Sequence, residues 1–259
     1  MDVNGARVLL TGATGGIGQE LARALHRAGA RLVLTGRRVD VLEPLAAETS
    51  AEVVAADLGD AAGLQRLVTG VGDVDVLVAN AALPGSGDFV TMSPDRIDAN
   101  IDVNLRAPIM LTHALLPGML ERKRGQVVFI GSLSGLVASP NSSMYNATKF
   151  GLRGFAHALR QDLHGTGVGV SIVHPGFVKD AGMFVDSGMD LPRGTRLVAP
   201  RRVARDVLAA IEKDRAEILS APGELALGSR LGGLAPALNA RIQRMAGAAD
   251  ITAVHRDAR

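Results

Sequence analysis

The chain has 259 residues, of which 47% are hydrophobic, 3% aromatic and 21% charged, and its formal net charge is only +2. This length allows one large α/β domain with a substantial buried core, and so small a charge does not indicate a nucleic-acid partner. The absence of cysteine excludes disulfides, thiolate metal sites and cysteine nucleophiles. The six histidines show no paired metal-ligand spacing, so we expect no metal site.

The N-terminus has no basic leader, and no apolar run reaches the roughly 18 residues that a spanning helix needs. We therefore expect a cytoplasmic protein. The charge is uneven, because residues 193–259 carry 12 Lys and Arg against 7 Asp and Glu. A basic C-terminal part suits an anionic substrate or a membrane surface, although a solvated face is the simpler interpretation.

The first 35 residues follow a strand–turn–helix–strand pattern. An apolar run at residues 7–11 precedes the glycine-rich stretch 12–18, and a helical pattern then continues to Gly29. A second apolar run follows at residues 31–35. A glycine-rich turn in this context is typical of a nucleotide-binding β–α–β unit.

Three glycines of the turn have distinct physical roles. Gly12 allows a tight turn, Gly16 lets the backbone approach a pyrophosphate, and Gly18 lets the helix pack closely on the strand. The N–H groups at the start of the helix then face the phosphates. We predict that the phosphate-binding residues are Gly12, Thr14, Gly16, Ile17 and Gly18.

The end of the second strand indicates which dinucleotide binds. A carboxylate there would bond the ribose 2′-hydroxyl of NAD and repel a 2′-phosphate. Gly36 stands at this place, followed by Arg37 and Arg38, and no acid occurs before Asp40. Because guanidinium groups suit a phosphate dianion, we favour NADP(H), with NAD(H) as the alternative.

A second group of polar residues follows the buried strand predicted at residues 126–130. Ser132 lies just past this strand, at the carboxyl edge where open α/β sheets bind ligands. Tyr145, the only tyrosine, precedes Lys149 by four residues, so in a helix the two share one face. A free phenol has a pKa of about 10, and a nearby ammonium group would lower it toward neutral pH. The three residues are therefore candidates for acid–base catalysis, and an ordinary helix with a surface lysine is the other interpretation.

Six motifs occur along the chain in the order known from one enzyme family. They are Thr-Gly-x-x-x-Gly-Ile-Gly at 11–18, Asp57-Leu58 after a third strand at 53–56, Asn80-Ala81 after a fourth at 74–78, Asn104 in a long helix, Ser132 with Tyr145 and Lys149, and Pro175-Gly176 after a sixth strand. In these motifs the chain, from about residue 7 to 221, resembles the short-chain dehydrogenase/reductase family.

The resemblance implies a Rossmann-like, doubly wound parallel sheet with helices on both faces, and an NAD(P)-dependent oxidoreductase that interconverts a carbonyl and an alcohol. It implies that Ser132 orients the substrate oxygen and that Tyr145 is the acid or base. Lys149 would lower the pKa of Tyr145 and hold the nicotinamide ribose, and Asn104 would anchor a water. Further cofactor contacts are implied at Asp57, Leu58, Asn80, Ala81, Pro175, Gly176 and Val178, besides Tyr145 and Lys149.

Some positions depart from the family pattern. Ala79 and Ala82 replace an Asn and a Gly around Asn80, and Asp180 stands where a Thr usually bonds the nicotinamide carboxamide. A carboxylate can also accept from that amide, and the backbone of Val178 is expected to carry more of this contact.

The second half contains the less regular segments. Residues 176–199 mix apolar side chains with glycines and resemble the family's substrate-binding loop. Their apolar content indicates either a hydrophobic substrate or the packing of a lid. We predict a catalytic domain at 1–222 and a helical extension with a tail at 223–259. The apolar positions of the extension fit, in this order, a cover on the substrate pocket, an oligomer contact, or a membrane-surface segment. By resemblance, the long helices near 104–120 and 145–163 form the interface of a homodimer or homotetramer.

Two other functions remain open from the sequence alone. One is a catalytically silent dinucleotide-binding sensor or scaffold, against which the intact Ser132, Tyr145, Lys149 and Asn104 argue. The other is a membrane-peripheral reductase that acts on lipid-like ketones through the C-terminal segment.

Overall fold

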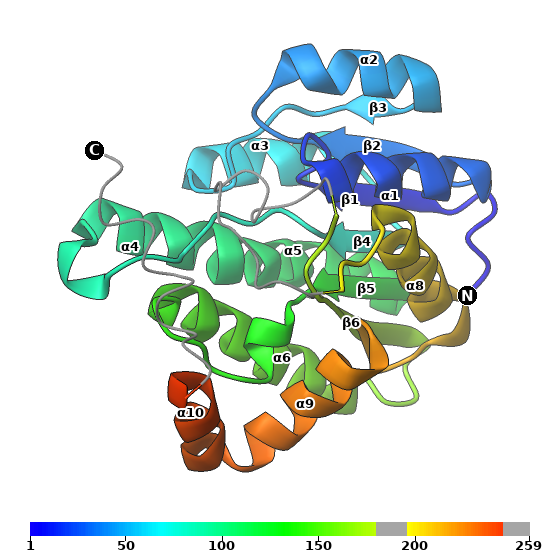
Figure 1. Cartoon of the computed structure of the whole chain (residues 1–259). Helices are drawn as coiled ribbons and strands as arrows, with labels where there is room; N and C mark the ends of the chain where they lie inside the picture. The colour runs from blue at the N-terminus through cyan, green and yellow to red at the C-terminus, as the bar shows by residue number, and fades with distance from the viewer. Residues whose placement is uncertain (180–195, 246–259) are drawn as a thin grey trace.

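Seven parallel strands form one sheet in the computed structural model, which describes residues 1–179 and 196–245 (Figure 1). The strand order is β3-β2-β1-β4-β5-β6-β7, so the order reverses between β1 and β4. The strands are β1 (Arg7–Thr11), β2 (Arg31–Thr35), β3 (Glu52–Val53), β4 (Val76–Ala79), β5 (Gly125–Ile130), β6 (Val168–Pro175) and β7 (Glu217–Ser220). Ligands of open α/β sheets bind at such a reversal, beyond the carboxyl ends of the strands.

Helices cover both faces of this sheet (Figure 1). They are α1 (Gly16–Arg27), α2 (Val39–Thr49), α3 (Ala61–Val71), α4 (Pro94–Ile101), α5 (Ala107–Glu121), α6 (Ser143–Asp162), α8 (Pro200–Lys213), α9 (Gly223–Leu234) and α10 (Pro236–Met245), with 3₁₀ turns at Phe89–Thr91 and Leu133–Gly135. The predicted doubly wound sheet is thereby confirmed.

Successive side chains along each strand pack into two separate cores. Val8 and Leu10 belong to one apolar cluster with residues of α1, α2 and α8, whereas Leu9 belongs to a second cluster with residues of α3, α5 and α6. All three side chains are fully buried. Burial on both faces explains why the strands are continuous runs of Val, Leu and Ile rather than alternating patterns.

Two predicted elements differ in detail from the structure. The third strand, predicted at residues 53–56, is only Glu52–Val53, because it lies at the sheet edge and pairs on one side alone. The long helical segment predicted around Asn104 spans Pro94–Glu121 and contains a wider, π-helical turn at Asp102–Arg106 between α4 and α5. Such turns are frequent at functional sites.

The two ends of the predicted substrate loop are joined by a short parallel bridge. The Val198 N–H donates to the Phe177 carbonyl (2.7 Å) and the Lys179 N–H donates to the Val198 carbonyl (2.9 Å). Asp180 and the apolar residues of this loop at 183–191 lie outside the described residues, whereas Phe177 lies within them. The bridge holds Val178, which is buried, beside the cleft described next.

Candidate active site

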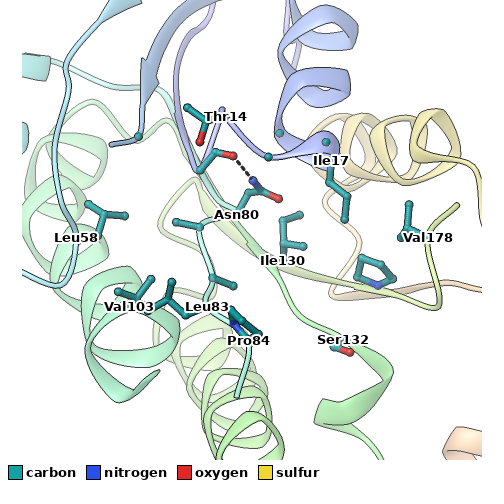
Figure 2. Close-up of a pocket in the computed structure, with 18 of the residues that line it drawn as sticks. Thr14, Ile17, Leu58, Asn80, Leu83, Pro84, Val103, Ile130, Ser132 and Val178 are labelled. Atoms are coloured by element: carbon teal, nitrogen blue, oxygen red, sulfur yellow. Dashed lines mark hydrogen bonds between the residues drawn. The ribbon is translucent and has the colours of Figure 1, made fainter. Parts of the chain in front are cut away.

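A cleft of about 760 Å³ opens at the carboxyl ends of β1, β2, β4, β5 and β6. Its size lies in the range of cofactor sites. Ser132, which Figure 2 labels, lines it together with Tyr145 and Lys149. The predicted cofactor-binding residues also line it: Gly12, Thr14, Gly16, Ile17, Gly18, Arg37, Arg38, Asp57, Leu58, Asn80, Ala81, Pro175, Gly176 and Val178. Asn104 is the one predicted site residue that does not.

The glycine-rich turn fits a pyrophosphate. Gly12 has a positive φ of 64°, and a Cβ there would lie only 2.7 Å from the Ala81 Cα. A Cβ on Gly18 would collide with the Gly12 carbonyl, so the close start of α1 on β1 requires glycine. The N-cap residue Gly15 makes no side-chain cap, and the first turn of α1 contains no acid. The N–H groups at this helix start are therefore available to a phosphate.

Asn80 braces this turn from the neighbouring strand. Its Nδ2 donates to the carbonyls of Thr11 and Gly12, both at 3.0 Å, and Figure 2 marks one of these hydrogen bonds with a dashed line. The backbone N–H groups of Asn80 and Ala81 both donate to the Thr11 hydroxyl, also at 3.0 Å. The side-chain amide thus holds the shape of the phosphate-binding turn.

The end of β2 presents two guanidinium groups to the cleft. Arg38 donates to the Thr14 carbonyl (2.7 Å), and Arg37 lies 3.9 Å from the Asp57 carboxylate with 63% of its side chain exposed. A Cβ on Gly36 would lie 2.9 Å from the Thr14 methyl group. A carboxylate at position 36 would therefore require Thr14 to shift.

Ser132, Tyr145 and Lys149 meet at the end of β5. The Ser132 Oγ accepts from the Ser134 N–H (3.1 Å), and the Ser132 and Tyr145 hydroxyls are hydrogen-bonded to each other. Lys149 lies one turn after Tyr145 on α6, with its Nζ 5.6 Å from the centre of the phenol ring. The same Nζ donates to the Ile130 carbonyl (2.9 Å). The structure therefore brings the three predicted catalytic residues together.

The expected direction of the Tyr145 pKa shift is wrong. Burial raises the pKa of Tyr145 to about 12, and the hydrogen bond from Ser132 only reduces this rise. Burial also lowers the pKa of Lys149 to about 8, because it removes the ammonium group from water. The sequence showed the proximity of the two groups, whereas the cost of removing the phenolate from water decides the sign.

Asn104 does not line the cleft but binds the backbone of Leu83, which does. In the π-helical turn its buried amide accepts from the Leu83 N–H (2.6 Å) and donates to the Leu83 carbonyl (2.9 Å). Asn100, one turn earlier, donates to the Pro84 carbonyl (3.3 Å), and the Tyr145 N–H donates to the Gly85 carbonyl (3.4 Å). The side chain of Asn104 therefore fixes the loop that contacts the start of α6, and the predicted water-anchoring role stays a prediction.

Several residues that line or support the site escaped sequence reasoning. Leu83 and Pro84 form an apolar wall of the cleft. His174 directly precedes the Pro-Gly motif, and its buried ring bonds the Ser132 carbonyl (2.7 Å). A glycine on each side of Ser132, at 131 and 135, was the available signal that something packs closely there.

Comparison with known proteins agrees with the family resemblance of the sequence motifs. A family model described as short chain dehydrogenase matches residues 6–190. A ketoacyl reductase of Nostoc sp., HetN, is 37% identical over 226 residues, covering 84% of this chain and 79% of the relative. The NADP-dependent 3-hydroxy acid dehydrogenase YdfG of Salmonella typhi is 38% identical over 178 residues, covering 66% and 72%. A Sphingobium yanoikuyae short-chain dehydrogenase solved with NADPH superposes with a TM-score of 0.80 at 26% identity, covering 91% and 95%.

The chain belongs to the short-chain dehydrogenase/reductase family. It is an NAD(P)-dependent oxidoreductase that acts on CH–OH groups. Across residues 1–179 and 196–245, no helix is long and apolar enough to cross a membrane.

Proposed function

We propose that this chain is an NADP(H)-dependent enzyme that interconverts a carbonyl and an alcohol on a small, hydrophobic substrate, with Tyr145 as the acid or base. One observation carries the proposal: Ser132, Tyr145 and Lys149 meet in the same cleft as the glycine-rich turn. A bound nicotinamide would supply or accept the hydride, and the protein would hold the substrate oxygen and move its proton.

Each residue then has a defined task. Ser132 donates a hydrogen bond to the substrate oxygen and so fixes the carbonyl beside the phenol. Tyr145 gives that oxygen its proton in reduction. The raised pKa of Tyr145, about 12, keeps the phenol protonated at neutral pH, which is the form that donates a proton in reduction. Lys149, whose pKa burial lowers to about 8, can return a proton to Tyr145 near neutral pH.

The preference for NADP(H) rests on the end of β2. Arg37 and Arg38 line the cleft there, and Gly36 is packed against Thr14 where a carboxylate would otherwise select NAD. Relatives solved with NADP or NADPH have related folds, and a further relative is named NADP-dependent. NAD(H) is the competing cofactor.

For the substrate we propose a 3-oxo acid or its thioester or ester with an apolar chain. The relatives named ketoacyl reductase and 3-hydroxy acid dehydrogenase support this class. Leu83 and Pro84 add apolar surface near the catalytic tyrosine, because the adjacent Gly85 carbonyl accepts from the Tyr145 N–H.

The test is consumption of NADPH with acetoacetyl-CoA, ethyl acetoacetate and an unrelated cyclic ketone. Wild type should reduce at least one 3-oxo compound, and Tyr145→Phe should lower kcat by about 10² to 10⁴ while NADPH binding, followed by its fluorescence, stays nearly unchanged. Binding of NADPH with no turnover on any compound would instead support the dinucleotide-binding sensor. A Tyr145→Phe variant with the wild-type rate would refute the assigned role.

We also propose a homo-oligomer formed through α5 and α6. Met110 on α5 and Phe150 on α6 are each 41% exposed, although both are large apolar residues. Light scattering after size exclusion should give a dimer or tetramer, and Phe150→Asp should shift it toward monomer. A monomeric wild type would rule out this interface.

One observation favours the membrane-peripheral alternative. Large apolar side chains of α9 and α10 are 55–82% exposed: Leu227, Leu231, Leu234, Leu238, Ile242 and Met245. Asn239 and Gln243, on another side of α10, instead donate to the Ala138 carbonyl of the loop after Ser132 (3.5 and 2.9 Å). Co-sedimentation with anionic phosphatidylserine vesicles tests this alternative. If wild type and its Leu231→Ser variant both stay in the supernatant, the membrane-peripheral alternative is excluded. The helices of the predicted extension at 223–259 would then be a pocket cover or an oligomer contact.

A further inference from the structure

An imidazole ring is enclosed beneath the catalytic serine. His174, near the end of β6, is fully buried. A Cβ on Gly131 would lie 2.6 Å from its Nδ1, and a Cβ on Gly135 would lie 3.5 Å from its Cε1. These glycines stand on either side of Ser132 in the sequence. The turn that carries Ser132 is therefore shaped to accept this ring.

Both nitrogens of the ring face hydrogen-bond acceptors. Nδ1 lies 2.7 Å from the Ser132 carbonyl oxygen, and Nε2 lies 3.0 Å from the Glu217 carboxylate on β7. A carbonyl and an ionised carboxylate can only accept, so both ring nitrogens must donate. The imidazolium is the form of histidine that carries a proton on each nitrogen.

The groups around Glu217 favour its ionised form. Besides His174, its carboxylate accepts from Arg153 (2.7 Å) and lies 3.2 Å from His157, both on α6. The hydrogen bond from His174, with those from Arg153 and His157, holds the pKa of Glu217 well below its usual range. A buried cation with such a counter-charge satisfies the requirement that buried charges be paired.

The ring acts on Ser132 through its backbone. The Ser132 carbonyl accepts from His174 and also from the Gly135 N–H (2.9 Å), while the Ser132 Oγ accepts from the Ser134 N–H and bonds the Tyr145 hydroxyl. A charged donor on the carbonyl therefore fixes the peptide from which the catalytic hydroxyl projects. Loss of this donor would leave the serine hydroxyl less well directed at the substrate oxygen.

We propose that protonated His174, held by Glu217, is the positioning residue for Ser132. His174 itself touches neither the phenol nor the substrate in this arrangement. Its contribution is to keep the Ser132 hydroxyl in the orientation that binds the transition-state oxygen.

Two amide variants separate the two hydrogen bonds of the ring. His174→Asn can place its amide nitrogen near the Nδ1 position and keep a donor for the Ser132 carbonyl. His174→Gln reaches the Nε2 position, keeps a donor for Glu217 and loses the Ser132 bond. The proposal predicts that His174→Gln lowers kcat with NADPH and ethyl acetoacetate about 10- to 100-fold, that His174→Asn recovers most of this loss, and that KM for NADPH is unchanged in both. The exposed His164→Gln serves as the matched control and should behave like wild type.

The same substitution in a Ser132→Ala enzyme distinguishes a positioning role from a general loss of structure. If His174 acts through the Ser132 hydroxyl, His174→Gln should lower the residual rate of a Ser132→Ala enzyme by less than twofold. The same 10- to 100-fold loss in that background, or equal rates for the Asn and Gln variants, would overturn the proposal. Melting temperatures of all variants show whether each remains folded.

The protonation state has its own readout, which does not depend on turnover. Nitrogen-15 NMR of histidine-labelled protein should contain a residue, absent from His174→Asn, with protons on both ring nitrogens. A neutral ring at that position would overturn the proposal. The kinetic arm rests on the proposed function, so a wild type that reduces no compound would refute that function while the NMR result still decides the state of His174.

Discussion

The burial of Tyr145 makes a direct prediction about its ionisation. In the folded protein the pKa of the phenol is raised to about 12, whereas an unfolded chain has the ordinary value of about 10. At about pH 10.5 roughly 3% of Tyr145 should be phenolate in the folded state and about three quarters in the unfolded state. The measurement is unusually clean, because the chain has one tyrosine and no tryptophan.

The assay is the near-ultraviolet absorbance of the phenolate, followed in a pH titration of native protein and of protein unfolded in urea. The sign of the linked stability change follows from the same shift. Above pH 10 the unfolded chain releases the tyrosine proton first, so rising pH destabilises the fold, by about 1 kcal/mol at pH 10.5. This loss is small beside the typical stability of a domain, so the native titration remains measurable.

A native midpoint near 10 or below would refute the reasoning. It would mean that the Lys149 ammonium outweighs burial. The Lys149→Met variant separates the two effects: burial alone predicts almost the same native curve in the variant, whereas control by the ammonium predicts a curve moved to higher pH. Circular dichroism at each pH verifies that the titrated protein is folded.

Three further predictions follow from buried or clustered charge. At pH 7 Lys149→Met should raise the free energy of unfolding by about 2 kcal/mol, and by less at pH 9.5. The reason is that burial lowers the pKa of Lys149 to about 8, so that its charged form destabilises the fold below that pH. Urea denaturation checks this, with the exposed Lys213→Met as the control. Arg37→Ala should raise KM for NADPH about tenfold and leave KM for NADH unchanged, whereas Arg66→Ala, similarly exposed but outside the cleft, should alter neither; equal changes with both cofactors would contradict a 2′-phosphate contact. Glu217→Gln should lower the free energy of unfolding at pH 7 by about 3 kcal/mol. Because the pKa of Glu217 is depressed, wild type is more stable than Glu217→Gln above the ordinary carboxyl pKa and loses this extra stability as the pH falls. The urea unfolding curves of wild type and Glu217→Gln should therefore converge in acid.

Local sequence patterns predicted the parts of the site that depend on backbone geometry. The spacing of Gly12, Gly16 and Gly18 predicted a turn that no side chain could replace, and the structure shows the collisions that a Cβ would cause at 12 and 18. The four-residue spacing of Tyr145 and Lys149 placed them on one helix face because helical periodicity is a local property.

Properties that depend on distant residues could not be predicted in this way. The sign of the Tyr145 shift depends on how completely other segments exclude water from the phenol. The partnership of His174 with Glu217 joins residues 43 positions apart, and it exists because β6 and β7 are adjacent in register. The loop held by Asn104 is likewise 21 residues away from it. Neither pairing has a local pattern.

Two buried basic side chains beside Ser132 have different partners. Lys149 donates to the Ile130 carbonyl and His174 to the Ser132 carbonyl, so they hold the carbonyl groups of the residues on either side of Gly131. His174 lies 3.0 Å from the Glu217 carboxylate, its partner in the positioning role that we propose. For Lys149, burial is the dominant influence among the described residues, and its pKa falls to about 8. Of the two, Lys149 is thus the group whose lowered pKa suits proton transfer beside Tyr145, whereas the two hydrogen bonds of the His174 ring suit a positioning role.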